Sequence, residues 1–181
     1  IDVIVLSHIH GDHTGGLGSV LAEKRDVVAW VPVSFPGRFK KALLSLGVGI
    51  EEVSKAREIM AGVYTTGELG REIREQALVL KTVDGLVVIT GCAHPGVVDV
   101  VRQAKAVTGE DTVYLVLGGF HLVGQPTSRI RSILRDLRRL SVRKVAPCHC
   151  SGDEARKLFK QEYGADYMEC GVGRRITLRI R

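Results

Sequence analysis

The stretch that decides the fold is SHIHGDHTGG, residues 7–16, in which three histidines and one aspartate occupy four of six successive positions. In an extended segment the side chains of His8 and His10 point to the same side, so both imidazoles can reach one metal ion. A glycine then lets the chain turn, and Asp12 and His13 can face a second, adjacent position. Imidazole and carboxylate ligands together suit zinc, manganese or iron better than calcium. The stretch therefore predicts a metal site.

The remaining histidines occupy the same kind of position in the chain. Each of the six histidines comes shortly after an apolar run that reads as a strand; the runs are residues 1–6, 86–90, 113–117 and 144–147, and the histidines are His8, His10, His13, His94, His121 and His149. In open α/β sheets, ligands bind beyond the carboxyl ends of the strands. We therefore expect these loops to converge on one site.

Working outward, the pattern of apolar residues predicts a layered α/β fold. Further strands are expected at residues 27–31, 59–65, 76–82 and 175–180, and helices at residues 17–24, 39–46, 97–107, 128–140 and 153–163. Asp84-Gly85 lies between two apolar runs and indicates a hairpin. No linker or low-complexity stretch divides the chain, so residues 1–181 are predicted to form a single α/β domain.

Composition narrows the class of protein further. Hydrophobic residues make up 45% of the chain and charged residues 25%, as in an ordinary globular domain. No apolar run approaches the roughly 18 residues that span a bilayer, so we expect a cytoplasmic protein without a membrane partner. The four cysteines have no C-x-x-C spacing and are expected to be free thiols.

SHIHGDHTGG resembles the H-x-H-x-D-H signature of the metallo-β-lactamase superfamily. The later segments ITGCAHPG, LGGFHL and PCHCSG and the ending ECGVGRRITL resemble a narrower branch of metal-dependent hydrolases, which includes the methanopterin-pathway dihydropterin–aminobenzene-phosphate synthase. The resemblance implies an αββα sandwich. It also implies strands upstream of the signature, one of which ends in a supporting aspartate. Because the chain begins with Ile1 in a strand, we expect it to lack these N-terminal strands.

The resemblance also implies the metal ligands. His8 and His10 bind a first ion, whereas Asp12 and His13 bind a second ion that His149, the last histidine of the superfamily pattern, completes.

The remaining ligand departs from the superfamily pattern, because Gly91-Cys92 stands where a Gly-Asp pair with a bridging aspartate is usual. Our choice for the last histidine of the first ion is His94. Three readings stay open: His94 substitutes for the missing ligand, Cys92 contributes, or the site holds one metal only.

His121 has no counterpart among the superfamily ligands. It is a candidate substrate contact, general acid or extra ligand, and the alternative is a loop histidine bonded to backbone. If the segment around His149 is extended, Cys148 and Cys150 point away from it, and we interpret them as small buried residues rather than ligands.

The expected activity is metal-dependent hydrolysis of a small molecule. One or two divalent ions, zinc before manganese or iron, activate water, and Asp12 orients that water or takes its proton. Phosphate esters are the first substrate class, followed by lactones and thioesters.

Four alternatives stay open. They are a synthase-like pterin activity, a mono-iron redox enzyme, a nucleic-acid enzyme using the arginines of residues 129–144, and a non-catalytic relative. No aromatic residue interleaves those arginines, so a nucleic-acid partner is not expected. The sequence does not indicate an oligomeric state.

Overall fold

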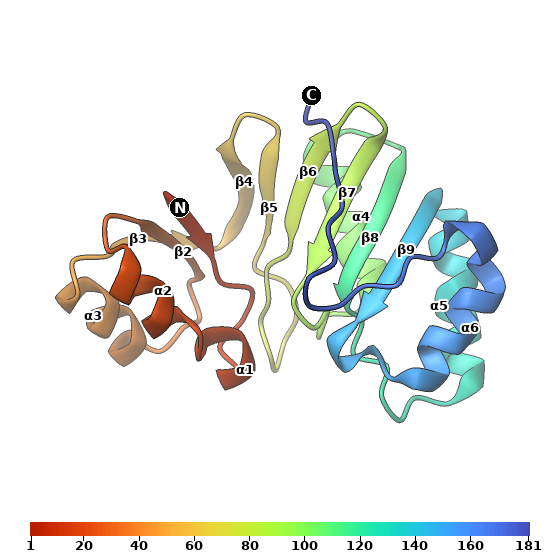
Figure 1. Ribbon diagram of the computed structural model, residues 1–181, viewed down its shortest axis with the longest axis horizontal. Helices are drawn as coiled ribbons and strands as arrows, with labels where there is room; N and C mark the ends of the chain where they lie inside the picture. Colours follow the sequence, from red (N-terminus) through yellow and green to blue (C-terminus); the bar gives the residue numbers. More distant parts are fainter.

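The computed structural model describes residues 1–181 as two β-sheets flanked by helices. Figure 1 shows the helices α2 (Leu17–Glu23) and α3 (Gly37–Ser45) at one side of the molecule and α5 (Thr127–Arg139) and α6 (Asp153–Tyr163) at the other, with the two sheets between them. The sheets have three and six strands. The expected αββα arrangement is therefore confirmed.

The N-terminal third of the chain builds the smaller sheet, in which all strands are parallel and the order is β1-β2-β3. Its elements are β1 (Val3–Val5), α1 (Gly11–Thr14), α2 (Leu17–Glu23), β2 (Val28–Pro32), α3 (Gly37–Ser45) and β3 (Gly49–Val53). An apolar cluster that includes Leu21, Val31 and Leu43 joins this sheet to α2 and α3.

The larger sheet has the order β4-β5-β6-β7-β8-β9, antiparallel up to β7 and parallel from β7 to β9. Its elements are β4 (Lys55–Met60), β5 (Val63–Gly67), β6 (Leu78–Thr82), β7 (Gly85–Thr90), α4 (Val97–Thr108), β8 (Val113–Gly119), α5 (Thr127–Arg139), β9 (Val142–Cys148) and α6 (Asp153–Tyr163), with short 3-10 helices at His149–Ser151 and Gly164–Asp166. The expected hairpin at Asp84-Gly85 joins β6 to β7.

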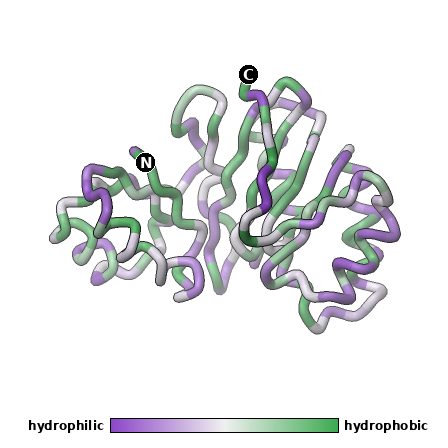
Figure 2. The backbone as a smooth tube through the Cα atoms, in the orientation of Figure 1, coloured by the Kyte–Doolittle hydropathy of each residue, from purple (hydrophilic) through white to green (hydrophobic).

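The main core lies between the larger sheet and helices α4, α5 and α6. The apolar stripe of α5 faces this core, with Ile130, Ile133, Leu134 and Leu137 buried, so the arginines of α5 lie on its outer side. Figure 2 shows apolar residues concentrated along the central strands, whereas α5 and α6 alternate between hydrophilic and apolar positions. No helix of the chain has the length and apolar character needed to cross a bilayer.

Three details of the sequence prediction were wrong. Residues 59–65 are not one strand, because the chain turns at Gly62, which has a φ of +74°, between β4 and β5. The strand β3 was missed, since Glu51 and Glu52 make it look polar.

The predicted closing strand at residues 175–180 forms only an isolated bridge, between Thr82 and Ile180. Both sides of β6 and β7 are already paired with neighbouring strands, so the segment has no free strand edge along its length. The alternation of apolar and polar residues in this segment still has a structural role. Ile176 and Leu178 pack against a small apolar cluster on the sheet face opposite the helices.

Buried Gln76 joins the two sheets where the histidine loops begin. Its Nε2 donates to the carbonyl oxygens of Leu6 and Trp30, and its backbone N–H donates to the carbonyl of Ser7. Its Oε1 accepts a hydrogen bond from the buried Thr65 hydroxyl. Since the side-chain amide and the backbone N–H of Gln76 make four hydrogen bonds, three of them to residues 6, 7 and 30, the position of β1 against the larger sheet is well determined.

Candidate metal centre

The loops that carry the histidines converge at one edge of the fold. His94, His121 and His149 follow β7, β8 and β9, and because these strands are parallel their carboxyl ends lie at the same edge of the sheet. The loop after β1 brings His8 to the same place from the smaller sheet. The predicted convergence is therefore observed.

A first group contains three histidines, His8, His10 and His94, whose ligand atoms lie within 4.8 Å of one another. His8 is fully buried, and its Nε2 lies 3.1 Å from Nδ1 of His10. The Nε2 of His94 is buried and has no hydrogen-bond partner. A buried polar atom without a partner is rare in proteins, so this nitrogen indicates a missing ligand.

A second group contains Asp12, His13 and His149. The Nε2 atoms of the two histidines are 3.1 Å apart, and Oδ2 of Asp12 lies 3.5 Å from the first and 3.2 Å from the second. The side chains of Asp12 and His149 are 56% and 41% exposed, so this group is open to solvent whereas His8 is not.

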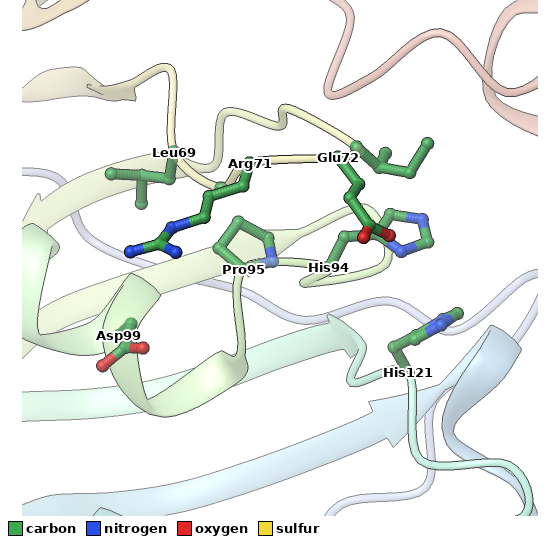
Figure 3. A pocket seen from close by; sticks show the side chains of 9 residues that line it. Leu69, Arg71, Glu72, His94, Pro95, Asp99 and His121 are labelled. Carbon is green, nitrogen blue, oxygen red and sulfur yellow. The ribbon is translucent and has the colours of Figure 1, made fainter.

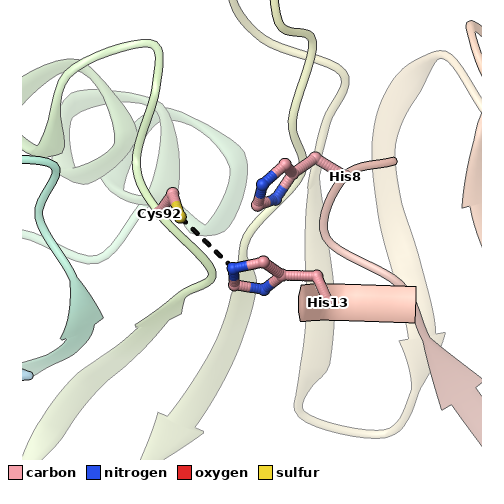
Figure 4. A group of neighbouring side chains, drawn as sticks. All are labelled: His8, His13 and Cys92. Atoms are coloured by element: carbon pink, nitrogen blue, oxygen red, sulfur yellow. Dashed lines mark hydrogen bonds between the residues drawn. The ribbon is translucent and has the colours of Figure 1, made fainter. Parts of the chain in front are cut away.

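Cys92 lies between the two groups. Its sulfur is 3.2 Å from Nε2 of His13, and His8, His13 and Cys92 form a further set of closely spaced ligand atoms (Figure 4). The preceding Gly91 has no room for a side chain, because a Cβ would overlap the side chain of Ser7. The thiol thus lies within reach of one ligand-type side chain from each group, His8 and His13.

The extended segment on which the expectation for Cys148 and Cys150 depended is not observed. The segment is not extended at His149, which has a φ of +51° and begins a 3-10 helix. As a result the Cys150 sulfur lies with Cys92 and His121 in another close set of ligand atoms. Cys148 is half-buried and makes no such contact with the histidines.

His121 is exposed, and its ring centroid lies 4.3 Å from that of His94. It also has a positive φ, +51°, a backbone conformation that is uncommon for residues other than glycine and that clusters at functional sites. No hydrogen bond joins its side chain to the backbone, in contrast to the alternative reading of a backbone-bonded loop histidine.

Burial favours the neutral form of three imidazoles of the site. Desolvation lowers the pKa of His8 to about 4 despite the nearby carboxylate of Glu75, and it also lowers the pKa of His13 and His94. At neutral pH their ring nitrogens therefore carry free lone pairs, as metal ligands must. Burial raises the pKa of the Cys92 thiol, so a metal ion would have to displace its proton.

Sequence reasoning missed Glu75. This side chain is 1% exposed and accepts hydrogen bonds from the backbone of the loop that carries Cys92 and His94. In the sequence it is one acidic residue in REQALVL, just before a strand, and nothing there distinguishes it from other acidic residues.

A cavity of about 650 Å³ opens beside the first group. Figure 3 shows His94 and His121 at one end, Asp99 at the other, and Arg71 and Glu72 on the loop above. A second, more apolar hollow borders the second group; it includes Asp12 and His13 together with residues of β1 and α2.

The donor set fits metal ions. Two nitrogen or oxygen ligands on one tetrahedral zinc are about 3.3 Å apart, since each lies roughly 2.0–2.1 Å from the ion. The spacing of His8 and His10 in the first group and the three spacings of the second group, 3.1 to 3.5 Å, are of this size. Ring nitrogens of His8 and His10 face one another, as do those of His13 and His149. The buried Nε2 of His94 has no partner. Bound ions explain this arrangement better than hydrogen bonds alone.

Comparison with known proteins agrees with this geometry. Residues 1–149 match the model of the metallo-beta-lactamase superfamily, and the chain belongs to this superfamily. It is 29% identical to the 7,8-dihydropterin-6-methyl-4-(beta-D-ribofuranosyl)-aminobenzene-5'-phosphate synthase of Methanocaldococcus jannaschii, covering 97% of this chain and 75% of that protein.

Two further similarities extend the comparison. An uncharacterized protein of the same archaeon is 27% identical, covering 88% of this chain and 73% of the relative. Among solved structures, Tm1679, a metal-dependent hydrolase of the beta-lactamase superfamily, superposes with a TM-score of 0.81 at 27% identity, covering 97% and 78% of the two chains. The resemblance drawn from the sequence motifs is confirmed.

Proposed function

We propose that this protein is a metal-dependent hydrolase with two adjacent metal positions. The observation that carries the proposal is the division of six ligand-type side chains into two compact sets, His8, His10 and His94 in one and Asp12, His13 and His149 in the other. Zinc suits these donors best, because histidine nitrogen predominates and only one carboxylate takes part. Manganese and iron are the alternatives that the same donors would accept.

The metal ions and the side chains around them would have different roles in the reaction. When bound, divalent ions would supply an activated water at neutral pH and polarise the carbonyl or phosphoryl group that this water attacks. Asp12 orients that water or takes its proton, since its carboxylate faces the second group and is open to solvent. His121 stands at the end of the cavity beside His94, where an imidazole can contact substrate or give a proton to the leaving group.

The residues that line the cavity favour an anionic substrate. Phosphate esters are the first candidates, followed by lactones or thioesters that carry a carboxylate. The Arg71 guanidinium is exposed in the cavity and takes part in none of the ion pairs of the chain, whereas Asp99 is paired with Arg102. A free guanidinium in a substrate cavity is suited to bidentate recognition of phosphate or carboxylate.

Metal content of the purified protein, measured by plasma mass spectrometry, tests the proposal. We expect near-stoichiometric zinc in the wild type, loss of metal from the first group in His10→Ala, and loss of phosphoesterase or lactonase turnover with it. His121→Ala is the matched control, since this histidine lies outside both groups: it should keep its metal and lose about 10²- to 10⁴-fold in turnover, the usual contribution of a general acid. A metal-free wild-type protein would contradict the proposal.

A synthase-like activity is the second candidate, favoured by the 29% identity to the methanogen synthase over nearly the whole chain. A direct assay would look for a product that joins a dihydropterin to a ribofuranosyl-aminobenzene 5'-phosphate. Product formation without ester hydrolysis would favour the synthase. Bound iron with oxygen uptake would instead favour a mono-iron redox enzyme on the same fold.

A further inference from the structure

Glu75 is a buried charged side chain that the proposed ligand set does not use. It lies just before β6, is 1% exposed, and has no lysine or arginine within ion-pair distance; His8 is its only ion-pair neighbour. Burying a carboxylate is costly unless hydrogen bonds replace the lost water. The partners of Glu75 therefore show what its burial is used for.

Those partners are four successive backbone amides. Oε1 accepts hydrogen bonds from the N–H groups of Gly91, Cys92 and Ala93 at 3.1, 2.8 and 2.9 Å, and Oε2 accepts one from His94 at 3.0 Å. Converging amides of this kind form an anion-binding nest, which here encloses a carboxylate of the same chain. Ala93 has a φ of +57°, an unfavourable conformation that the closed loop maintains.

The same carboxylate lies behind His8. Oε2 of Glu75 is 3.8 Å from Nδ1 of His8, while Nε2 of that ring faces His10. Histidines that bind a metal through one nitrogen usually direct the other toward a carboxylate or another acceptor, which fixes the ring and its tautomer. One oxygen of Glu75 thus accepts a hydrogen bond from the backbone of His94 and lies near the ring of His8. The hydroxyl of Ser7 is the hydrogen-bond partner of that Nδ1, at 3.1 Å, so the carboxylate acts on His8 through its charge. No hydrogen bond joins Glu75 to Asp12, His13 or His149.

We propose that Glu75 is a positioning residue that orients His8 and His94, and so sets the metal affinity of the first group but not of the second. The metal part of this proposal rests on the proposed function. The effect on the loop at residues 91–94 does not, because the four hydrogen bonds are independent of any ion.

Glu75→Gln is the informative variant because it keeps the size of the side chain. The amide oxygen can still accept from Gly91, Cys92 and Ala93, whereas the NH₂ group would then face the N–H of His94 and Nδ1 of His8. The NH₂ group and the N–H of His94 are both donors and would repel each other, and His8 would lose the neighbouring negative charge, so both histidines should be held less firmly.

Metal affinity is best measured in backgrounds that keep one group each. In His149→Ala, where only the first group is complete, adding Glu75→Gln should weaken zinc binding about 10- to 100-fold, the usual effect of losing an outer partner of a metal ligand. In His94→Ala, where only the second group is complete, the same change should shift the affinity less than about twofold.

Glu68→Gln is the matched control. The Glu68 side chain is 3% exposed and accepts hydrogen bonds from the backbone of Ser34 and from Arg74. It is thus also a buried carboxylate, directly after β5, but no hydrogen bond or ion pair joins it to a histidine. It should leave zinc affinity in both backgrounds unchanged. Equal weakening of both groups by Glu75→Gln, or none, would overturn the proposal.

A second measurement is amide hydrogen exchange of the wild-type protein without metal. It does not require the variant to fold, and it does not depend on the proposed function. The amides of residues 91–94 should be protected although they belong to no helix or strand, and Glu75→Gln should reduce the protection of His94 at least tenfold. Rapid exchange of all four amides in the wild type would overturn the proposal, whereas absence of zinc from both backgrounds with the amides still protected would overturn only the proposed function.

Discussion

The two ligand groups differ in burial, composition and support. The first, His8, His10 and His94, contains only imidazoles, includes the fully buried His8, and draws its members from the loops of both sheets. The second contains a carboxylate, and its Asp12 and His149 side chains are largely open to solvent. Adjacent positions on one edge of the fold thus offer a buried nitrogen site and an exposed mixed site.

This difference indicates which of the two groups binds its metal ion more tightly. A ligand that is buried and hydrogen-bonded before the ion arrives loses less freedom on binding than an exposed one. The first group has Glu75 behind it, whereas no buried carboxylate supports the second. We therefore expect the first group to bind the tighter ion and the second to exchange its ion more readily.

Removal of one histidine from each group should have the largest effect. His94→Ala should abolish the tight site and leave the weak one, and His149→Ala should abolish the weak site and leave the tight one. In each variant the zinc affinity of the affected group should fall by more than the roughly 100-fold that loss of an outer partner costs. Zinc titration of the two variants by calorimetry measures both affinities. Loss of both ions from either variant would show that the two groups do not act separately.

The cavity permits a smaller test, since it opens beside the first group only. Arg71→Ala should raise KM for a phosphate ester about tenfold, equivalent to about 1.4 kcal/mol, because an exposed charged hydrogen bond is lost. It should leave kcat nearly unchanged and affect a neutral lactone little. Arg131, an exposed arginine of α5 that does not line the cavity, provides the control Arg131→Ala, with unchanged KM for both substrates. An equal effect of Arg71→Ala on both substrates would exclude charge recognition.

The sequence predicted the histidine positions well because they depend on local patterns. Each apolar run predicted a strand, and parallel strands bring the residues that follow them to one edge of the sheet. His94 was our choice where the sequence departs from the family pattern, and the structure brings its ring close to His8 and His10. The assignment of these side chains as ligands stays a prediction until an ion is measured.

Other parts of the site could not be predicted because they depend on contacts between distant segments. The role of Glu75 arises only when the start of β6 meets the loop after β7, and Cys150 approaches Cys92 only because the chain turns at His149. The closing segment at residues 175–180 has the alternation of a strand, but whether it pairs depends on which strand edges are free.

The most direct test of the two-group account is a crystal structure of the zinc-loaded protein with anomalous scattering measured at the zinc edge. We predict two anomalous peaks, one among His8, His10 and His94 and the other among Asp12, His13 and His149. The distances from each peak to the Cys92 sulfur would show whether the thiol is a ligand. A single peak, or a peak outside these two groups, would contradict the account.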